Sequence, residues 1–134
     1  MRLVKTLPLL LLMVAGSAFS YDRGLSWKAS SLERAAYHLA HTVRHRTGYS
    51  HAHGDARRFA HQVRHFRRSV QKGRSIHRLN RDFRHIRNKY NHLMRSVNRS
   101  HRLHHSRHVN SDIRSIRHKF RRLHDGVHHA LDHH

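Results

Sequence analysis

The sequence predicts an all-α protein, an up-down four-helix bundle built from four copies of one amphipathic helix repeat. In each of four segments, apolar residues recur at alternating steps of four and three, which average about 3.5 residues and mark one seam along a helix. A strand would need a period of two, which none of these segments shows. Four such seams match left-handed, coiled-coil-like packing. Two of the segments, offset by 30 residues, are also identical at eight positions, namely Asn80, Asp82, Arg84, Ile86, Arg87, Lys89, Leu93 and Val97 and their counterparts.

Interruptions in this pattern mark the ends of the expected helices. Gly48 and Gly73 stand at the first two joints, where the chain must turn. The third connection, residues 98–108, is longer and rich in histidine, and an alternative is that the third helix continues through Leu103 before it turns. The four helices are therefore expected near residues 30–46, 54–72, 76–99 and 110–130.

Residues 1–20 have the layout of a secretory signal peptide. Two basic residues precede a short apolar stretch at 7–15. Small residues at Ala18 and Ser20 then precede a cleavage point before Tyr21. Because the apolar stretch is too short to span a bilayer, we expect cleavage and export, to the periplasm or out of the cell. An uncleaved N-terminal anchor is the alternative.

The exported part, residues 21–134, is expected to fold as one helical domain. The chain has no cysteine, so disulfides and thiolate metal sites are excluded and stability must come from packing. No apolar run after the signal approaches the roughly 18 residues of a membrane-spanning helix. A single chain can bury the seam, and a homodimer is the alternative.

Polar residues mark the expected starts of the helices. Ser30 and Glu33 fit a capping box, in which a serine hydroxyl and a glutamate three residues later satisfy free backbone N–H groups. Leu25 and Trp27 then lie in a lead-in segment before the first helix. A carboxylate near a helix start meets the positive end of the helix dipole, worth typically about 0.3–1 kcal/mol. Three aspartates share such a repeat position and are interpreted as structural rather than catalytic: Asp55, Asp82 and Asp112.

Arginine dominates the charge of the chain. The signal segment takes two of the 28 basic residues and none of the seven acidic ones, so the formal net charge falls only from +21 to +19. Guanidinium groups suit phosphate and sulfate, and a surface of one sign repels itself unless a polyanion neutralises it. We therefore predict binding of anionic lipid headgroups, acidic polysaccharide or extracellular nucleic acid. The predicted polyanion-binding residues are Arg57, Arg58, Arg64, Arg67, Arg68, Arg84, Arg87, Arg114, Arg117, Arg121 and Arg122.

The chain also has twenty histidines. With an ordinary pKa of about 6.5, they are mostly neutral at pH 7 and mostly charged near pH 5. His38, His65 and His92 share one repeat position outside the seam, so we expect them at the surface. Histidines three or four residues apart on a helix can share a metal ion, so a periplasmic protein that binds or buffers zinc, copper or nickel is the alternative function. The predicted ligands are His38, His41, His45, His61, His65, His101, His104, His105, His108, His124 and His128.

The sequence carries no pattern of a catalytic site. It has no cysteine nucleophile, Gly-x-Ser-x-Gly, phosphate-binding glycine loop or His-Glu-x-x-His. With Glu33 as its one glutamate and six aspartates, pairs for general acid–base catalysis are hard to assemble. We therefore predict a non-enzymatic, exported, basic helical-bundle protein that binds polyanions.

Overall fold

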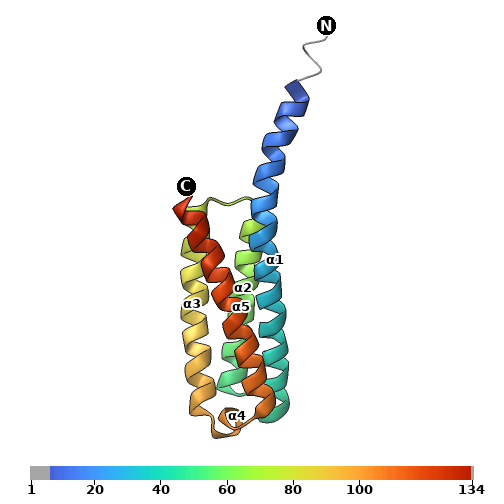
Figure 1. Ribbon diagram of the computed structural model, residues 1–134. Helices are drawn as coiled ribbons and strands as arrows, with labels where there is room; N and C mark the ends of the chain where they lie inside the picture. Colours follow the sequence, from blue (N-terminus) through green and yellow to red (C-terminus); the bar gives the residue numbers. More distant parts are fainter. Residues whose placement is uncertain (1–6, 134) are drawn as a thin grey trace.

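The computed structural model describes the backbone of residues 7–133 and the side chains of residues 23–133 (Figure 1). This part of the chain is all-helical, and no strand occurs in it. The predicted all-α class is therefore confirmed. Five helices follow one another: α1 (Leu7–Thr47), α2 (His51–Gln71), α3 (Ile76–Arg99), α4 (His101–His104) and α5 (Arg107–Asp132).

The long helices lie side by side (Figure 1). α1 contacts α2 and α5, α2 contacts α3, and α3 contacts α5. The short α4 lies at the end of the molecule where α3 leads into α5 (Figure 1). Of the predicted signal peptide, Arg2 and Lys5 lie outside the described residues, and the predicted cleavage point after Ser20 falls within α1.

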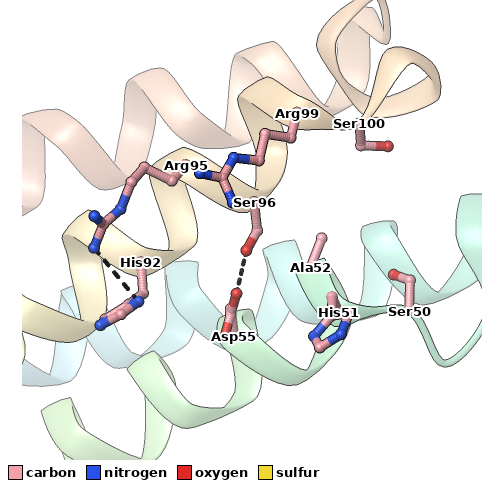
Figure 2. A pocket seen from close by; sticks show the side chains of 9 residues that line it. All are labelled: Ser50, His51, Ala52, Asp55, His92, Arg95, Ser96, Arg99 and Ser100. Atoms are coloured by element: carbon pink, nitrogen blue, oxygen red, sulfur yellow. Dashed lines mark hydrogen bonds between the residues drawn. The ribbon is translucent and has the colours of Figure 1, made fainter.

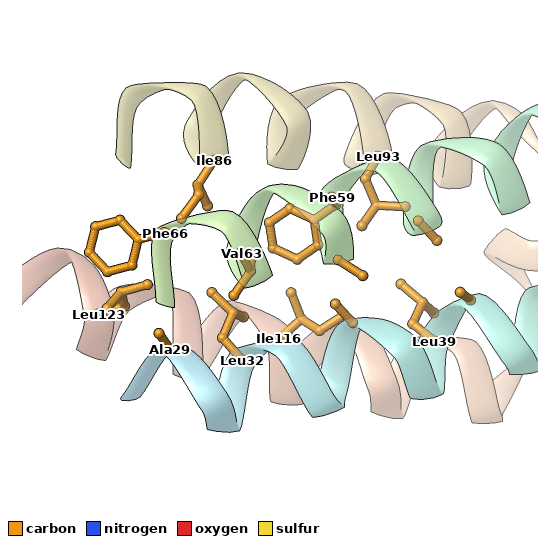
Figure 3. Close-up of a cluster of buried hydrophobic side chains, with 14 of the residues drawn as sticks. Ala29, Leu32, Leu39, Phe59, Val63, Phe66, Ile86, Leu93, Ile116 and Leu123 are labelled. Atoms are coloured by element: carbon orange, nitrogen blue, oxygen red, sulfur yellow. The ribbon is translucent and has the colours of Figure 1, made fainter. Parts of the chain in front are cut away.

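The predicted apolar seam forms the core (Figure 3). Two residues of the seam, Tyr90 and Phe120, are half-buried. Its other residues are buried, namely Leu25, Ala29, Leu32, Ala36, Leu39 and Val43 of α1, Ala52, Ala56, Phe59, Val63, Phe66 and Val70 of α2, Leu79, Phe83, Ile86, Leu93 and Val97 of α3, and Val109, Ile113, Ile116, Leu123 and Val127 of α5. The rings of Tyr90 and Phe120 stack, with centroids 4.3 Å apart and planes 8° from parallel, and so join α3 to α5. Leu103 is fully buried and anchors α4 to the same core.

The first helix begins well before its predicted start. Leu25 is buried, and the apolar spacing continues from it without a break, so packing against the other helices keeps this stretch helical. The predicted capping box is wrong, because Ser30 and Glu33 both lie inside α1. The predicted lead-in segment is wrong for the same reason, since Leu25 and Trp27 are helical.

Serines begin the other helices. In each, the side-chain oxygen accepts a hydrogen bond from the backbone N–H three residues on, over 3.3–3.4 Å. These N-caps are Ser50, Ser75, Ser100 and Ser106. The three recurrent aspartates lie a turn further in, and none of these helices has an acidic residue in its first turn. Because the dipole effect falls off within the first turn, the predicted role of these aspartates at helix starts is wrong.

The joints explain where the long helices end. Gly48 and Gly73 have φ of 65° and 68°, a left-handed conformation that glycine adopts without strain after a helix. Ser100 has an extended conformation, with φ −86° and ψ 112°, so α3 ends at Arg99. The alternative in which the third helix continues through Leu103 is therefore wrong.

Candidate anion-binding surface

Most of the predicted polyanion-binding arginines lie at the surface. Arg64 and Arg67 are half-buried, and the Arg67 Nε donates to Glu33 Oε2 over 2.6 Å. The Arg64 Nε lies 3.9 Å from Glu33 Oε1. Arg58 is exposed, but its Nη2 donates to Asp55 Oδ1 over 2.6 Å. The exposed residues of the predicted set are Arg57, Arg58, Arg68, Arg84, Arg87, Arg114, Arg117, Arg121 and Arg122.

Four of the seven acidic side chains lie at the interfaces between helices, with exposed fractions of only 11% to 16%. They are Glu33, Asp55, Asp82 and Asp112. On α5, Asp112 accepts a hydrogen bond from Thr42 Oγ1 of α1 over 2.9 Å. On α2, Asp55 accepts one from Ser96 Oγ of α3 (Figure 2). Most of the negative charge of the described residues is thus held inward, although Asp125 and Asp132 are exposed. Most of the exposed arginines lack an acidic neighbour among the described residues.

The recurrent aspartates meet the recurrent histidines of neighbouring helices. Between α1 and α5, His38 Nδ1 lies 3.1 Å from Asp112 Oδ2. Between α2 and α3, His65 Nε2 lies 3.8 Å from Asp82 Oδ2. The third pair, His92 of α3 with Asp55 of α2, interacts through charge. A histidine and an aspartate from equivalent repeat positions therefore meet at two helix interfaces.

A fourth pair of positions, equivalent to those of the three histidine–aspartate pairs, is occupied by two basic residues. Lys28 of α1 has the repeat position of the aspartates, and Arg122 of α5 has that of the histidines. The register set by His38 and Asp112 predicts that the two basic residues face each other across the α1–α5 interface, where Lys28 lies beside Gly126 of α5. Arg122 lies over the ring of the exposed Trp27, with its Cζ 5.4 Å from the ring centroid. This place therefore carries two positive charges where the others pair opposite signs.

Several of the predicted metal ligands lie beside one another as pairs of neighbouring rings. Neighbouring rings lie with centroids 4.3–5.9 Å apart in His41 with His45, His101 with His105, His104 with His105, and His124 with His128. The Nδ1 of His61 lies instead 3.3 Å from the Tyr37 hydroxyl, and His38 and His65 face aspartates. In residues 23–133, no group of three or more His, Asp or Glu side chains is placed to hold a metal ion.

One histidine that the sequence pattern did not single out is buried. His53, near the start of α2, is 7% exposed, and its ring packs edge-on against Tyr49 with centroids 5.6 Å apart. Burial, and then the charges of Arg57 and Arg44, lower the pKa of His53 below its ordinary value. The only signal in the sequence was its place directly after Ala52, beside the seam.

A cavity of about 650 Å³ lies between the start of α2 and the end of α3 (Figure 2). Its lining residues are Ser50, His51, Ala52, Asp55, His92, Arg95, Ser96, Arg99 and Ser100. Burial alone would raise the pKa of Asp55, but hydrogen bonds from Ser96 and Arg58, and the charges of Arg58 and His92, outweigh it and lower that pKa. The one carboxylate of this cavity is therefore already satisfied, while Arg95 has no acidic partner among the described residues.

A second cavity, of about 590 Å³, lies between the end of α1, α4 and the start of α5. Its lining residues are His41, Thr42, His45, Arg46, Arg102 and His108. It brings together three predicted metal ligands and two arginines, with no acidic side chain in its lining. Sequence reasoning missed the cavity arginines because they flank the joints. The signal that points to them is that the joints at 48–50 and 98–108 meet at one end of the molecule (Figure 1).

The chain matches no known protein-family model, and comparison with curated proteins and with solved structures finds no significant match. Over the described residues, none of the helices has the length and apolarity that a membrane crossing requires. A proposal for the function therefore has to rest on where the charged side chains lie.

Proposed function

We propose that this protein is an exported, non-enzymatic helical protein that binds polyanions through its exposed arginines. The polyanion is an anionic lipid headgroup, an acidic polysaccharide or extracellular nucleic acid. One observation carries the proposal: four acidic side chains are held at helix interfaces, while nine of the predicted arginines are exposed. The positive charge thus faces outward with little compensation, and self-repulsion on this scale favours a bound counter-charge.

The finer architecture belongs to the same proposal. We infer that α1, α2, α3 and α5 form an up-down four-helix bundle made of four copies of one helix repeat. The burial of the seam and the histidine–aspartate pairs at equivalent positions support this inference. A packed bundle of this kind holds guanidinium groups at fixed spacing, which suits a ligand with repeated charges.

Salt dependence is the property that tests polyanion binding. A protein that neutralises six to ten phosphates of duplex DNA loses about 10³- to 10⁵-fold in affinity between 50 and 200 mM salt, because bound counterions are released. We expect the purified protein to bind fluorescent heparin, duplex DNA or anionic vesicles with this steep dependence. Absence of binding to all three at 0.1 M salt contradicts the proposal.

Substitutions on one helix face test the arginines themselves. Arg114, Arg117 and Arg121 are exposed and lie within two turns of α5. Replacing all three by glutamine is expected to weaken binding and to make the dependence on salt shallower. The matched triple replacement by lysine keeps the charge, so the salt dependence is expected to stay near that of the unmodified protein. Equal binding by the glutamine variant contradicts a role for this face.

Export is tested separately. Expression with the complete N-terminus in a secreting bacterial host is expected to yield a protein that starts at Tyr21 and is found outside the cytoplasm. Intact mass spectrometry measures the N-terminus. Retention of residues 1–20 in the exported protein contradicts cleavage and supports the anchor alternative.

A further inference from the structure

The cavity between α2 and α3 gathers arginine and histidine side chains from two helices (Figure 2). Arg95 and Arg99 come from the last turns of α3, and His51 comes from the first turn of α2. Both arginines are exposed, and neither forms an ion pair with an acidic side chain among the described residues. The Arg95 Nη2 forms a long hydrogen bond with His92 Nδ1, over 3.5 Å.

The single carboxylate in the lining does not oppose an anion strongly. Both oxygens of Asp55 accept hydrogen bonds, Oδ2 from Ser96 and Oδ1 from Arg58. Arg58 also brings a full positive charge to that carboxylate over 2.6 Å. The unmatched charge of the cavity therefore comes from Arg95 and Arg99.

The shape of this donor set favours phosphate over carboxylate. A carboxylate offers two oxygens in one plane, which a single guanidinium fork can satisfy. A phosphate group offers three oxygens on a tetrahedron, and guanidinium and imidazole groups from two helices can approach it from different sides. The volume of about 650 Å³ exceeds what one phosphate fills, so there is room for a second phosphate or an attached sugar.

We propose that the cavity between α2 and α3 binds a phosphomonoester or diphosphate group, held by Arg95 and Arg99 with His51 and His92 beside them. This inference deepens the proposed polyanion function, on which it rests, by giving the ligand class and the place where it binds. The phosphate is carried either by a lipid headgroup or by a soluble molecule, and both present the same chemistry to the cavity.

The test uses inorganic pyrophosphate, measured by calorimetry on the purified protein at pH 7 and 0.1 M salt. We expect saturable binding that the double substitution R95Q/R99Q weakens by about tenfold or more, because it removes two charged hydrogen-bond donors from the cavity. The matched control is R78Q/R81Q, which removes the same charge from exposed positions on the same helix, outside this cavity and outside the predicted polyanion-binding set. Circular dichroism checks that both variants remain helical.

The outcomes separate a site from general attraction. Loss confined to R95Q/R99Q supports the phosphate site, whereas equal loss in both variants, or no saturable pyrophosphate binding, overturns it. Heparin binding is measured on the same samples. If the unmodified protein binds heparin but both variants lose pyrophosphate equally, only this inference fails; if heparin binding is absent as well, the polyanion function fails too.

Vesicles identify the source of the phosphate. Phosphatidic acid presents a phosphomonoester and phosphatidylglycerol a phosphodiester, so the two are compared at equal surface charge. Stronger binding to phosphatidic acid that depends on Arg95 and Arg99 supports the site and assigns it to a lipid headgroup. Pyrophosphate binding with no preference between the vesicles supports the site and assigns it to a soluble phosphate.

Discussion

His38 of α1 lies against Asp112 of α5, with Nδ1 3.1 Å from Oδ2, and the same relationship recurs between His65 and Asp82. In both cases the aspartate is mostly buried and the histidine is mostly exposed. The aspartate therefore belongs to the helix interface, and the imidazole covers it from outside. Acidic residues that are scarce in the sequence are placed where they hold helices together.

Removing one of these carboxylates is expected to weaken the fold. Asp112 accepts a hydrogen bond from Thr42 and faces His38, so Asp112→Ala is expected to lower the free energy of unfolding by about 1–2 kcal/mol. Urea denaturation followed by circular dichroism measures the change. The control Asp132→Ala removes an exposed carboxylate and is expected to stay within about 0.5 kcal/mol of the unmodified protein. Equal effects would show that the α1–α5 interface does not depend on Asp112.

Because His53 is buried, we expect the free energy of unfolding to depend on pH. Its pKa is lowered in the folded state, so below the ordinary value of about 6.5 the unfolded chain binds more protons than the folded one. Stability is therefore expected to fall as the pH drops below about 6.5, by at most about 1.4 kcal/mol per pH unit from this residue.

The replacement His53→Gln is expected to make the fall in stability between pH 7 and pH 5 shallower. Slopes are compared, because the substitution also alters packing. Urea denaturation at several pH values measures them, and His77→Gln, which removes an exposed histidine of α3, is the matched control. If the free energy of unfolding changes with pH as steeply in His53→Gln as in His77→Gln, this account is contradicted.

The two basic residues at the α1–α5 interface offer a stabilising substitution. Lys28→Asp would place an aspartate opposite Arg122, as the other interfaces place one opposite a histidine. We expect a gain of about 0.5 kcal/mol in the free energy of unfolding, measured by urea denaturation and within the range of surface ion pairs. The same substitution in an Arg122→Gln background tests the pairing. A gain of equal size there would mean that the new carboxylate does not act through Arg122.

Metal binding is expected to be weak. In residues 23–133, no three histidine, aspartate or glutamate side chains are placed to hold one metal ion, so an ion would find at most two suitable ligands. We expect zinc and copper to bind no more tightly than about 10 μM at pH 7.5, and more weakly at pH 5.5, where protonated imidazole cannot ligate. Calorimetry on the unmodified protein and on H41Q/H45Q measures this. Tighter binding that depends on these histidines would restore the metal-binding alternative.

The core could be predicted from the sequence because apolar spacing is a local property of each helix. The seam from Leu25 to Val127 is buried as its spacing indicates, apart from the half-buried Tyr90 and Phe120. Glu33 shows the limit of local patterns, since Ser-x-x-Glu also occurs inside a helix, where the glutamate is free to bind arginines of the next helix. The unbroken spacing from Leu25 onward was the stronger signal for a continuous α1.

The candidate site was harder to predict because it depends on which helices face each other. Aligning the copies shows that Asp82 and Asp112 are equivalent, but not that one meets His65 and the other His38. That relationship is set by the register between antiparallel helices, and hence by the lengths of the joints. Arg95 was likewise unremarkable until the end of α3 was placed beside the start of α2.

Trp27 is the only tryptophan of the chain, and Arg122 lies over its ring. The protein therefore carries one indole fluorophore, on the part of α1 that is several turns away from His41 and His45, which line the cavity beside α4. A change in its emission reports on the neighbourhood of Arg122, and a ligand confined to the cavities near α4 leaves that emission largely unaltered. A simple optical titration can thus tell at which end of the molecule an anion has bound.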